Sequence, residues 1–521
     1  MKNFTTKAAA VGLLWGCAFY QPCAGKTNSS IYHLPYKLNA LPHGGEHGLT
    51  LAHNRAHGLA ITLNSEEALA PDFTCPFTKS ILQVKDITPP PIQGATYTII
   101  PDPAVLTNNV AGDSLKVLAK TILQDSRLDT IQARALRLLT GFAAGTSYGE
   151  VWIRDFNTFI RGSLQVAPQE KVKEMLLRFF QLQGEDGNIV DGFIPKEKAY
   201  VGYEYRYSDL APGWAAHKNT VETDQESSLV QAIKKYIDAT GDTSILHETI
   251  GGKTVLARLE DAFAYLLKDR WSEKYGLVTG ATTIDWGDVQ PEKGWGVRIN
   301  EHTKWAIDIY DNAMLLIALH DFNTILPRGY KPRRDWNTVA AGIRRHVRQY
   351  LWQSKAQKYL PHLYLNGSPF SAGFNEAAIL YTGGTACAVL AGLHNKAEIA
   401  AINRQMLAAA AKEKYATIGI TVYPPYPEKE FPNMKPYVYQ NAGDWTWFGG
   451  RMIQALTANG FVKEAYSELS PMIDRALEQK GFHEWYDVET GAPKGSGDFR
   501  GEAGVLYDAI SQLRQWAKQH A

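Results

Sequence analysis

Hydrophobic positions recur with helical spacing from residue 113 to near the end of the chain. Residues 461–479 place Ala465, Leu469 and Met472 on one stripe and charged residues elsewhere, which is typical of a helix with one solvent-exposed face. Residues 306–319 are apolar on nearly every side, which indicates a helix enclosed by other helices. The pattern predicts about twelve helices, near residues 113–140, 156–166, 168–184, 223–240, 252–271, 304–323, 335–352, 374–393, 396–411, 444–459, 461–479 and 502–519.

The two kinds of helix alternate along the chain. Helices with one polar face belong on the outside of a helical array, whereas helices without one belong inside it. Twelve helices that alternate between an outer and an inner ring describe an all-α fold, an (α/α)6 barrel, over residues 113–521. An irregular helical domain or a solenoid is the alternative, but no repeat of fixed period supports a solenoid.

Long loops rich in Trp, Tyr, Asp, Glu and Gly precede every second helix. In an array whose helices run alternately up and down, every second connection lies at the same end. We therefore expect six loops to converge on one site, a pocket of carbohydrate size with aromatic and carboxylate walls. These loops lie at residues 152–155, 214–224, 281–301, 366–375, 423–447 and 481–502.

The first residues of the chain resemble a secretion signal. Lys2 and Lys7 provide positive charge, residues 8–19 are mostly apolar, and small residues suited to cleavage follow, so we expect a signal peptide at residues 1–25. This predicts export to the periplasm or the extracellular space. Lipid attachment at Cys17 is the alternative fate of this segment, because the residues before it resemble a lipoprotein box.

Residues 26–112 have a different composition from the helical part. They contain Pro, Gly and His and short strand-like runs at 59–63 and 95–100, which predicts a small N-terminal extension or cap. Outside the signal the chain has two cysteines, Cys75 and Cys387. We expect Cys387 to be a buried thiol in an apolar run, and a disulfide between the two is the alternative.

Charge and motifs exclude several classes of function. The chain has 54 basic and 53 acidic residues, so its net charge of +1 offers no field for nucleic acid or an anionic membrane. After the signal, no segment has the roughly 20 unbroken apolar residues of a membrane span. Motifs for zinc, nucleotides or a nucleophilic serine are absent. We expect a monomer that acts on a small, neutral carbohydrate without a cofactor or a catalytic metal.

Two of the loops carry candidates for acid–base chemistry. Asp285 and Asp288 lie beside Trp286, and Glu484 lies beside Trp485. Hydrolysis of a glycosidic bond needs one carboxylic acid to protonate the leaving oxygen and one carboxylate to activate water or attack the sugar. A neighbouring aromatic ring excludes water and raises the pKa of the acid. A role for these carboxylates in helix caps or turns is the alternative.

The order and wording of the loops resemble those of inverting exo-glycosidases on six-hairpin barrels, which include trehalases, processing α-glucosidases and mannosylglycerate hydrolases. Residues 283–286 and 484–487 are similar to the stretches that carry the acid and the base in trehalases, and residues 439–445 resemble the substrate stretch between them. The resemblance implies an inverting, exo-acting hydrolase of an α-linked sugar, with Glu484 as the base. The acid is Asp285 or Asp288, because the first motif lacks its preceding Gly-Trp. Trehalose itself is not supported as the substrate.

The stretch from Trp152 to Asp155 resembles the Trp-x-Arg-Asp of glucoamylase-like barrels, whose Arg and Asp bind hydroxyls of the terminal sugar. An Arg fork and a carboxylate offer directional donors and acceptors to neighbouring hydroxyls, although a structural Arg–Asp pair at a helix start is the alternative. Asp224 opens the next inner helix, where capping is the alternative to sugar contact. The expected substrate-binding residues are Trp152, Arg154, Asp155, Glu222, Asp224, Trp286, Gln440, Trp445, Trp447 and Glu502.

Two other functions fit the same fold, because function belongs to the site rather than to the fold. A sugar epimerase or polysaccharide lyase would need His or Tyr as proton carriers, and His302, His483 and Tyr486 are candidates. A glycan-binding barrel without catalytic activity is the third alternative.

Overall fold

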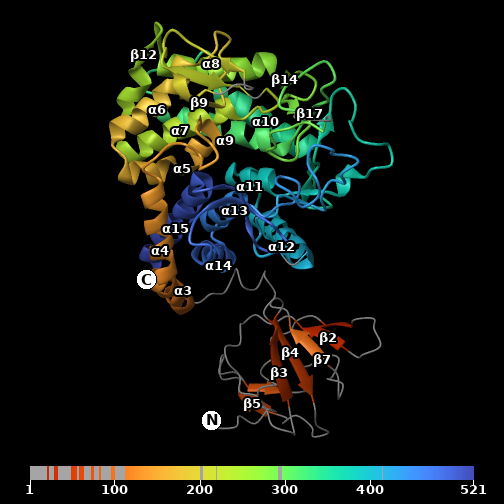
Figure 1. Cartoon of the computed structure of the whole chain (residues 1–521). Coiled ribbons are helices and arrows are strands. Elements are labelled where there is room, and N and C mark those ends of the chain that lie inside the picture. The colour runs from red at the N-terminus through yellow and green to blue at the C-terminus, as the bar shows by residue number, and fades with distance from the viewer. Residues whose placement is uncertain are drawn as a thin grey trace. The chain divides into compact units, whose positions relative to one another are not determined.

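The computed structural model describes residues 112–199, 204–218, 220–291, 296–413 and 415–521, together with the backbone of seven strands before residue 100. The chain forms two compact units, Met1–Val117 and Leu118–Ala521 (Figure 1). Cys17, Cys75 and the expected signal peptide lie outside the described residues, apart from the backbone of one short strand at residues 20–22.

The N-terminal unit contains a five-stranded sheet of order β1-β2-β7-β4-β3 and a separate β5-β6 pair. Strands β2 and β7 run parallel, and the other paired strands are antiparallel. The strands are β1 Tyr20–Pro22, β2 Ser29–Tyr32, β3 Leu49–Asn54, β4 Gly58–Leu63, β5 Asp72–Thr74, β6 Ile81–Gln83 and β7 Thr96–Ile99.

Six helices of the C-terminal unit close a ring. Helix α5 packs on α7, and the contacts continue through α9, α11, α13 and α15, which packs back on α5. Helix α9 is buried on nearly all sides, as the apolar run at residues 306–319 predicts. The six inner helices are α5 Ile153–Val166, α7 Gln225–Thr240, α9 Ile309–Ile325, α11 Gly383–Leu390, α13 Thr446–Ala458 and α15 Arg500–His520.

Other helices pack around this ring. Helix α4 contacts α15, α6 and α8 contact α7, α10 contacts α9, and α14 contacts α13. Helix α14 buries Ala465, Leu469, Met472 and Ile473, the stripe that the sequence predicts. These helices are α3 Gly112–Gln124, α4 Ser126–Leu138, α6 Gln169–Gln181, α8 Val255–Asp269, α10 Trp336–Tyr350, α12 Lys396–Glu413 and α14 Val462–Glu478.

Two expected helices differ from the sequence prediction. The segment at 113–140 is broken at Asp125, whose side chain accepts the backbone N–H of Arg127 at 3.0 Å and thereby starts α4 as a new helix. The segment at 374–393 becomes helical only at Gly383. The chain before it forms the 3-10 turn η4 Glu376–Ala378 and strand β21 Leu380–Tyr381, which pairs with β22 Val422–Tyr423.

Short strands, few of which the sequence predicts, stiffen the connections between helices. A four-stranded sheet of order β10-β11-β9-β8 surrounds the start of α5, and β23 pairs with β24 before α15. Their bounds are β8 Val151–Trp152, β9 Gly192–Pro195, β10 Tyr205–Arg206, β11 Trp214–His217, β23 His483–Tyr486 and β24 Pro493–Gly497. The others are β12 Thr249–Ile250, β13 Lys253–Thr254, β14 Trp271–Ser272, β15 Leu277–Val278, β16 Gly280–Ala281, β17 Trp305–Ile307, β18 Trp352–Gln353, β19 Lys358–Tyr359 and β20 Leu363–Tyr364, with 3-10 turns η2 Lys196–Lys198 and η3 Thr243–His247.

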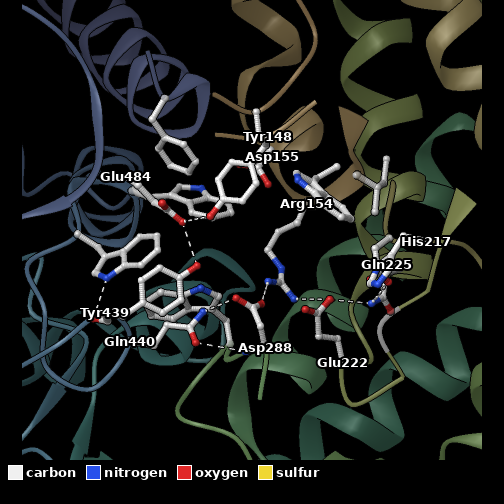
Figure 2. Close-up of a pocket in the computed structure, with 18 of the residues that line it drawn as sticks. Tyr148, Arg154, Asp155, His217, Glu222, Gln225, Asp288, Tyr439, Gln440 and Glu484 are labelled. Atoms are coloured by element: carbon white, nitrogen blue, oxygen red, sulfur yellow. Dashed lines mark hydrogen bonds and ion pairs between the residues drawn. The ribbon is translucent and has the colours of Figure 1, made fainter. Parts of the chain in front are cut away.

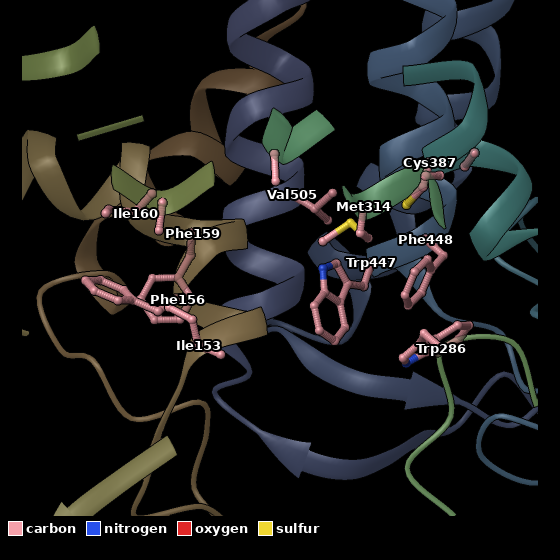
Figure 3. Packing of buried hydrophobic residues seen from close by; sticks show 14 of the residues in the cluster. Ile153, Phe156, Phe159, Ile160, Trp286, Met314, Cys387, Trp447, Phe448 and Val505 are labelled. Atoms are coloured by element: carbon pink, nitrogen blue, oxygen red, sulfur yellow. The ribbon is translucent and has the colours of Figure 1, made fainter. Parts of the chain in front are cut away.

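The core lies inside the helical ring. Phe156 and Phe159 of α5, Trp447 and Phe448 of α13 and Val505 of α15 are all buried in one cluster (Figure 3). Burial of each such side chain stabilises the fold by about 1.5–3 kcal/mol, so the ring is a firm base for the loops at its ends. The core also encloses a free cysteine thiol on α11, as expected for that residue. Over the described residues, no helix has the length and apolar character needed to cross a membrane.

Candidate active site

A cavity of about 180 Å³ lies at the N-terminal ends of the inner helices. Residues 153–155 form the first turn of α5, Gln225 begins α7, and Trp447 lies in the first turn of α13. We name it the carboxylate pocket, because five lining residues are Asp or Glu. Its lining consists of Ala144, Tyr148, Trp152, Ile153, Arg154, Asp155, Asp191, His217, Glu222, Gln225, Trp286, Asp288, Val297, Tyr439, Gln440, Trp445, Trp447, Glu484 and Phe499.

Ten of the thirteen candidate residues predicted from the sequence line this pocket. They are Trp152, Arg154, Asp155, Glu222, Trp286, Asp288, Gln440, Trp445, Trp447 and Glu484. The other three, Asp224, Asp285 and Glu502, are carboxylates buried behind the wall, where each accepts hydrogen bonds from other parts of the chain.

Glu484 is held by three hydrogen bonds on strand β23. Its Oε1 accepts the hydroxyls of Tyr148 at 2.7 Å and Tyr439 at 2.9 Å, and its Oε2 accepts the backbone N–H of Ser496 at 2.8 Å (Figure 2). Burial raises the pKa of Glu484, and the three hydrogen bonds oppose that rise. The carboxylate is therefore fixed in one orientation toward the pocket.

The position opposite Glu484 in strand β24 requires glycine. Gly495 has φ of +67°, and a Cβ atom there would lie 2.3 Å from Oε2 of Glu484. Any side chain would push the carboxylate away from the N–H of Ser496, and the left-handed backbone would be strained as well. The hairpin sequence thus supports the position of Glu484.

Asp288 faces the pocket from the opposite loop. Its Oδ1 accepts Nη1 of Arg154 at 3.0 Å, and its Oδ2 accepts Nε2 of Gln440 at 2.8 Å. About a quarter of its side chain is exposed, at 26%. Asp288 is therefore oriented by two side chains and still accessible to a ligand.

Asp285, the first candidate for the acid, does not line the pocket. Its side chain points to the start of α11, where Oδ2 accepts the N–H of Gly383 at 2.7 Å and Oδ1 that of Gly384 at 2.8 Å. Burial raises the pKa of Asp285 to about 8, although both N–H groups lower it. Unsatisfied N–H groups at a helix start attract a carboxyl group, so Asp285 caps α11. The assignment of the acid to Asp285 therefore does not fit its position.

Arg154 connects several carboxylates of the site. Its Nε and Nη2 bind the two oxygens of Asp224 at 2.7 and 2.9 Å. Its Nη2 also lies 3.1 Å from Oε2 of Glu222 (Figure 2). Asp224 also accepts the hydroxyl of Tyr310 at 2.8 Å and is only 1% exposed. The sequence predicts Asp224 as a substrate contact. In the structure Asp224 holds Arg154 from behind and does not line the pocket.

Glu222 lies at the same guanidinium. Its Oε2 also accepts Nε2 of Gln225 at 2.8 Å. Burial raises the pKa of Glu222 well above its usual range; Arg154 opposes this, whereas the carboxylate charges of Asp191 and Asp288 and a hydrogen bond with Asp288 add to it. The raised pKa of Glu222 favours its protonated form beside Asp288.

Glu502 is the third predicted contact that the structure moves out of the pocket. Its Oε2 accepts the N–H of His483 at 2.5 Å and the hydroxyl of Tyr486 at 2.9 Å, and the residue is fully buried. These two partners, His483 and Tyr486, are the first and last residues of strand β23, and Glu484 and Trp485 lie between them. Glu502 therefore secures the strand that carries Glu484.

Asp155 lines the pocket, is 8% exposed, and its Oδ1 has no hydrogen-bond partner within the described part of the chain. Burial raises the pKa of Asp155 to about 7, against the opposing charge of Arg154. A buried oxygen without a donor is costly. Asp155 thus places a carboxyl group in the pocket wall, with one oxygen buried and without a donor from the described residues.

Aromatic rings form much of the remaining wall. Trp286 stacks on Phe448 with ring centroids 3.5 Å apart and meets Trp445 edge-on at 5.4 Å. Trp447 donates its Nε1 to the hydroxyl of Thr158 at 2.8 Å. Such rings bind the apolar faces of sugar rings, and their own packing keeps them in place.

Several lining residues are not among the predicted contacts. Nδ1 of His217 lies 3.1 Å from Oδ2 of Asp191, whose Oδ1 accepts Nε2 of Gln225 at 2.8 Å. The ring of His217 also meets that of Trp152 edge-on at 5.6 Å. His217 lies within the predicted loop at 214–224 but was not singled out there. Asp191 lies outside the predicted loops, so the sequence carries no signal for it. Tyr148 and Tyr439 carry a weak signal only, because each lies close to a predicted loop residue.

The residues suggested for an epimerase or lyase lie elsewhere. His302 is exposed, and neither His483 nor Tyr486 lines the carboxylate pocket. Other proton carriers, Tyr148, Tyr439 and His217, do line it. Over the residues that the structure describes, no group of three or more His, Cys, Asp or Glu side chains is arranged to hold a metal ion.

The chain matches no protein-family model and no curated protein sequence. It is similar to solved structures of a GH63 mannosylglycerate hydrolase from Thermus thermophilus. The structure with glucose has 16% sequence identity and a TM-score of 0.53, and the similarity covers 72% of this chain and 99% of that one. The structure with Tris and D-glycerate has 16% identity, a TM-score of 0.54 and the same coverage. The resemblance to this type of glycoside hydrolase is therefore confirmed as a similarity of fold.

Proposed function

We propose that the protein is an exo-acting, inverting glycoside hydrolase of an α-linked sugar, built on an (α/α)6 barrel. The observation that carries this proposal is the placement of Asp288 and Glu484, which come from distant loops, in the lining of one pocket. The closed ring of inner helices and the helices packed around it support the barrel. The fold similarity to a mannosylglycerate hydrolase supports the class of reaction.

Glu484 is the base in this proposal. The hydroxyls of Tyr148 and Tyr439 and the N–H of Ser496 stabilise its ionised form. Ionised Glu484 takes a proton from a water molecule, whose oxygen forms the new bond to the anomeric carbon. Inversion requires room for this water, and inverting glycosidases hold their two carboxyl groups roughly 6.5–9.5 Å apart.

Asp288 is the acid, which gives its proton to the departing glycosidic oxygen. Asp288 accepts a hydrogen bond from Arg154, and the carboxyl of Glu222 lies at the same guanidinium. Glu222 and Asp288 share a hydrogen bond, and the pKa of Glu222 is raised by burial and by the charge of Asp288. Glu222 is therefore placed to share its proton with Asp288.

Size and charge of the pocket support the choice of substrate. A cavity of about 180 Å³ suits one sugar ring rather than a stretch of polysaccharide, which favours exo action. Its five carboxyl groups face one guanidinium, so an uncharged sugar fits better than a uronic acid. Because the Thermus enzyme was solved with glucose and with D-glycerate, a hexose joined to a short polar group is the first substrate class to test.

The decisive experiment is incubation with α-linked disaccharides and aryl glycosides, with the anomeric form of the product followed by proton NMR. Release of the β-anomer as the first product supports inverting hydrolysis, and release of the α-anomer would overturn inversion. An unsaturated product would identify a lyase, an epimeric sugar an epimerase, and binding without turnover a glycan-binding protein.

Export of the chain is a further part of the proposal. Residues 1–25 would be removed, unless Cys17 is lipidated and anchors the protein. The mass of the mature protein from membrane and soluble fractions distinguishes these fates, and size-exclusion chromatography with light scattering tests the expected monomer.

A further inference from the structure

A second cavity, of about 240 Å³, lies within the same ring of helices. It shares no lining residue with the carboxylate pocket. In Figure 3, Trp447 and Phe448 lie between Trp286, which lines the carboxylate pocket, and Met314 and Cys387, which line the second cavity. All six inner helices contribute to its lining.

Basic side chains distinguish this cavity from the carboxylate pocket, and we name it the basic cavity. Four cations line it, Arg161, Lys234, Lys235 and Arg451, together with three carboxylates, Asp238, Asp321 and Asp508. The formal charge of this lining is therefore +1. That of the carboxylate pocket is −4, from five carboxylates and one guanidinium, with histidine counted as neutral.

Two of the four cations are neutralised by ion pairs. Arg161 lies 3.2 Å from Oδ2 of Asp508, and Lys234 pairs with Asp238. Asp238 is exposed, so the second pair lies at the rim. These two pairs account for two of the three carboxylates of the cavity.

The other two cations form no ion pair with any residue that the structure describes. Lys235 donates to the carbonyl oxygen of Asn157. Arg451, 7% exposed, donates to Sγ of Cys387 at 3.4 Å and to Oγ1 of Thr158 at 3.1 Å. Neutral acceptors bind the donors of both groups but supply no counter-charge in direct contact, and a buried charge without a paired counter-charge is costly.

The third carboxylate of the cavity, Asp321, does not pair with either of these cations. Asp321 is half-buried and lies more than 4 Å from the amino group of Lys235, since the two form no ion pair. Burial lowers the pKa of Lys235 to about 7, and the charge of Arg161 lowers it further. The side chains of Lys235 and Arg451 thus line one cavity with Asp321 and Asp508. The charges of these two carboxylates act on Lys235, but neither forms an ion pair with Lys235 or Arg451.

We propose that the basic cavity binds a small oxyanion between Lys235 and Arg451. A guanidinium fork and an ammonium group together offer several charged donors to one phosphate, sulfate or carboxylate group. The volume of the cavity suits a small ion and excludes a nucleotide or a polyanion. Arg451 lies over the rings of Trp447 and Phe448, with its guanidinium carbon 5.3 and 5.0 Å from the ring centroids. These two rings would therefore separate the oxyanion from the carboxylate pocket.

The test is isothermal titration calorimetry of the full chain with inorganic phosphate, sulfate and acetate, at constant ionic strength set with chloride. Binding should be saturable and should raise the melting temperature by mass action. The Lys235→Met variant should lose about tenfold or more in affinity, because it loses one of the two unpaired cations. Preference for phosphate and sulfate would identify a tetrahedral oxyanion site, and preference for acetate a carboxylate site.

Lys234→Met is the matched control, since Lys234 is the next residue and its charge is already paired with Asp238. Its affinity should stay within about threefold of that of the wild type, which is less than 1 kcal/mol. If Lys235→Met unfolds, Lys235→Arg should fold and keep the affinity. No saturable binding, or equal losses in the two methionine variants, would overturn the proposal and leave a hydrated cavity. This test needs no catalytic readout, so its outcome is independent of the proposed hydrolase activity.

Discussion

Tyr439 and Gln440 are consecutive residues, and each holds one of the two facing carboxylates. Tyr439 donates to Glu484 at 2.9 Å, and Gln440 donates to Asp288 at 2.8 Å. Tyr439 has φ of +54°, a conformation uncommon outside glycine, and its carbonyl accepts Nε1 of Trp445 at 3.0 Å. One strained segment of backbone therefore determines where both carboxylates lie.

Tyr439→Phe should lower kcat/KM and move its acidic limb to higher pH. The lost hydroxyl stabilises ionised Glu484, so the pKa of Glu484 should rise and the base should become protonated at a higher pH. The check is a pH profile of kcat/KM. Tyr437→Phe, in the same loop but outside the pocket lining, is the control and should leave the limb in place. A lower melting temperature with an unshifted limb would reduce Tyr439 to a packing role.

Glu484→Gln should lower turnover by roughly 10²-fold or more, the usual size of general-base catalysis. The amide keeps the shape of the carboxylate but cannot take a proton from water. Glu489→Gln is the matched control, because Glu489 is exposed near the turn of the same hairpin. Normal turnover by Glu484→Gln, measured with an aryl glycoside, would refute the base assignment.

Asp288→Asn and Asp285→Asn should have opposite effects. Asp288→Asn should abolish most activity with little change in stability, because Asp288 faces the pocket. Asp285→Asn should destabilise the fold by about 1–3 kcal/mol, since its amide nitrogen cannot accept one of the two N–H groups at the start of α11. Denaturant unfolding together with kcat of the folded fraction separates the two. Full activity in Asp288→Asn would show that another carboxylate is the general acid.

Asp155→Asn should make the protein more stable at pH 8 but less active. The pKa of Asp155 is about 7 in the folded chain, against about 3.9 for an unfolded Asp. Its contribution to stability is therefore fully present below about pH 4 and is lost as the pH rises through 7. The variant should match the wild type at pH 4, exceed its melting temperature at pH 8, and have a lower kcat/KM because the sugar loses an acceptor.

Thermal melts between pH 4 and pH 8 test this prediction, with Asp209→Asn, an exposed position, as the control. A wild-type melting temperature that does not fall relative to the variant over this range would contradict it. Unchanged kcat/KM would remove Asp155 from the proposed sugar contacts.

The helices were the most predictable part of the molecule, because their apolar spacing repeats over many residues. The segment expected at 444–459 is α13, Thr446–Ala458. The breaks were less predictable: Asp125 divides one expected helix, and a strand pairing delays α11 to Gly383. These outcomes depend on a single side-chain hydrogen bond and on a distant partner strand, neither of which affects the spacing of apolar residues.

In the site, too, the residue types were predictable from the sequence and their orientations were not. Aromatic and acidic loop residues were identified by composition, but Asp285 and Asp288 are three positions apart in one loop, and composition cannot tell which carboxylate faces the pocket. Asp285 has φ of +53°, and this turn directs its side chain toward α11. His217 lies in the predicted loop at 214–224, but its place in the pocket depends on the pairing of β9 and β11, which the spacing of residues does not reveal.

The return of α15 to α5 has a consequence for synthesis of the protein. Tyr148 and Glu484 are separated by 336 positions, and α15 follows both. On the ribosome, the chain must therefore emerge beyond residue 500 before the last inner helix can join the first. Until then the apolar faces of the inner helices have no final partner, and such long-range closure is slow and exposes the chain to aggregation. A nascent chain stalled before residue 500 would lack the closed ring around the carboxylate pocket, so a ligand of that pocket can protect the chain only after α15 has emerged.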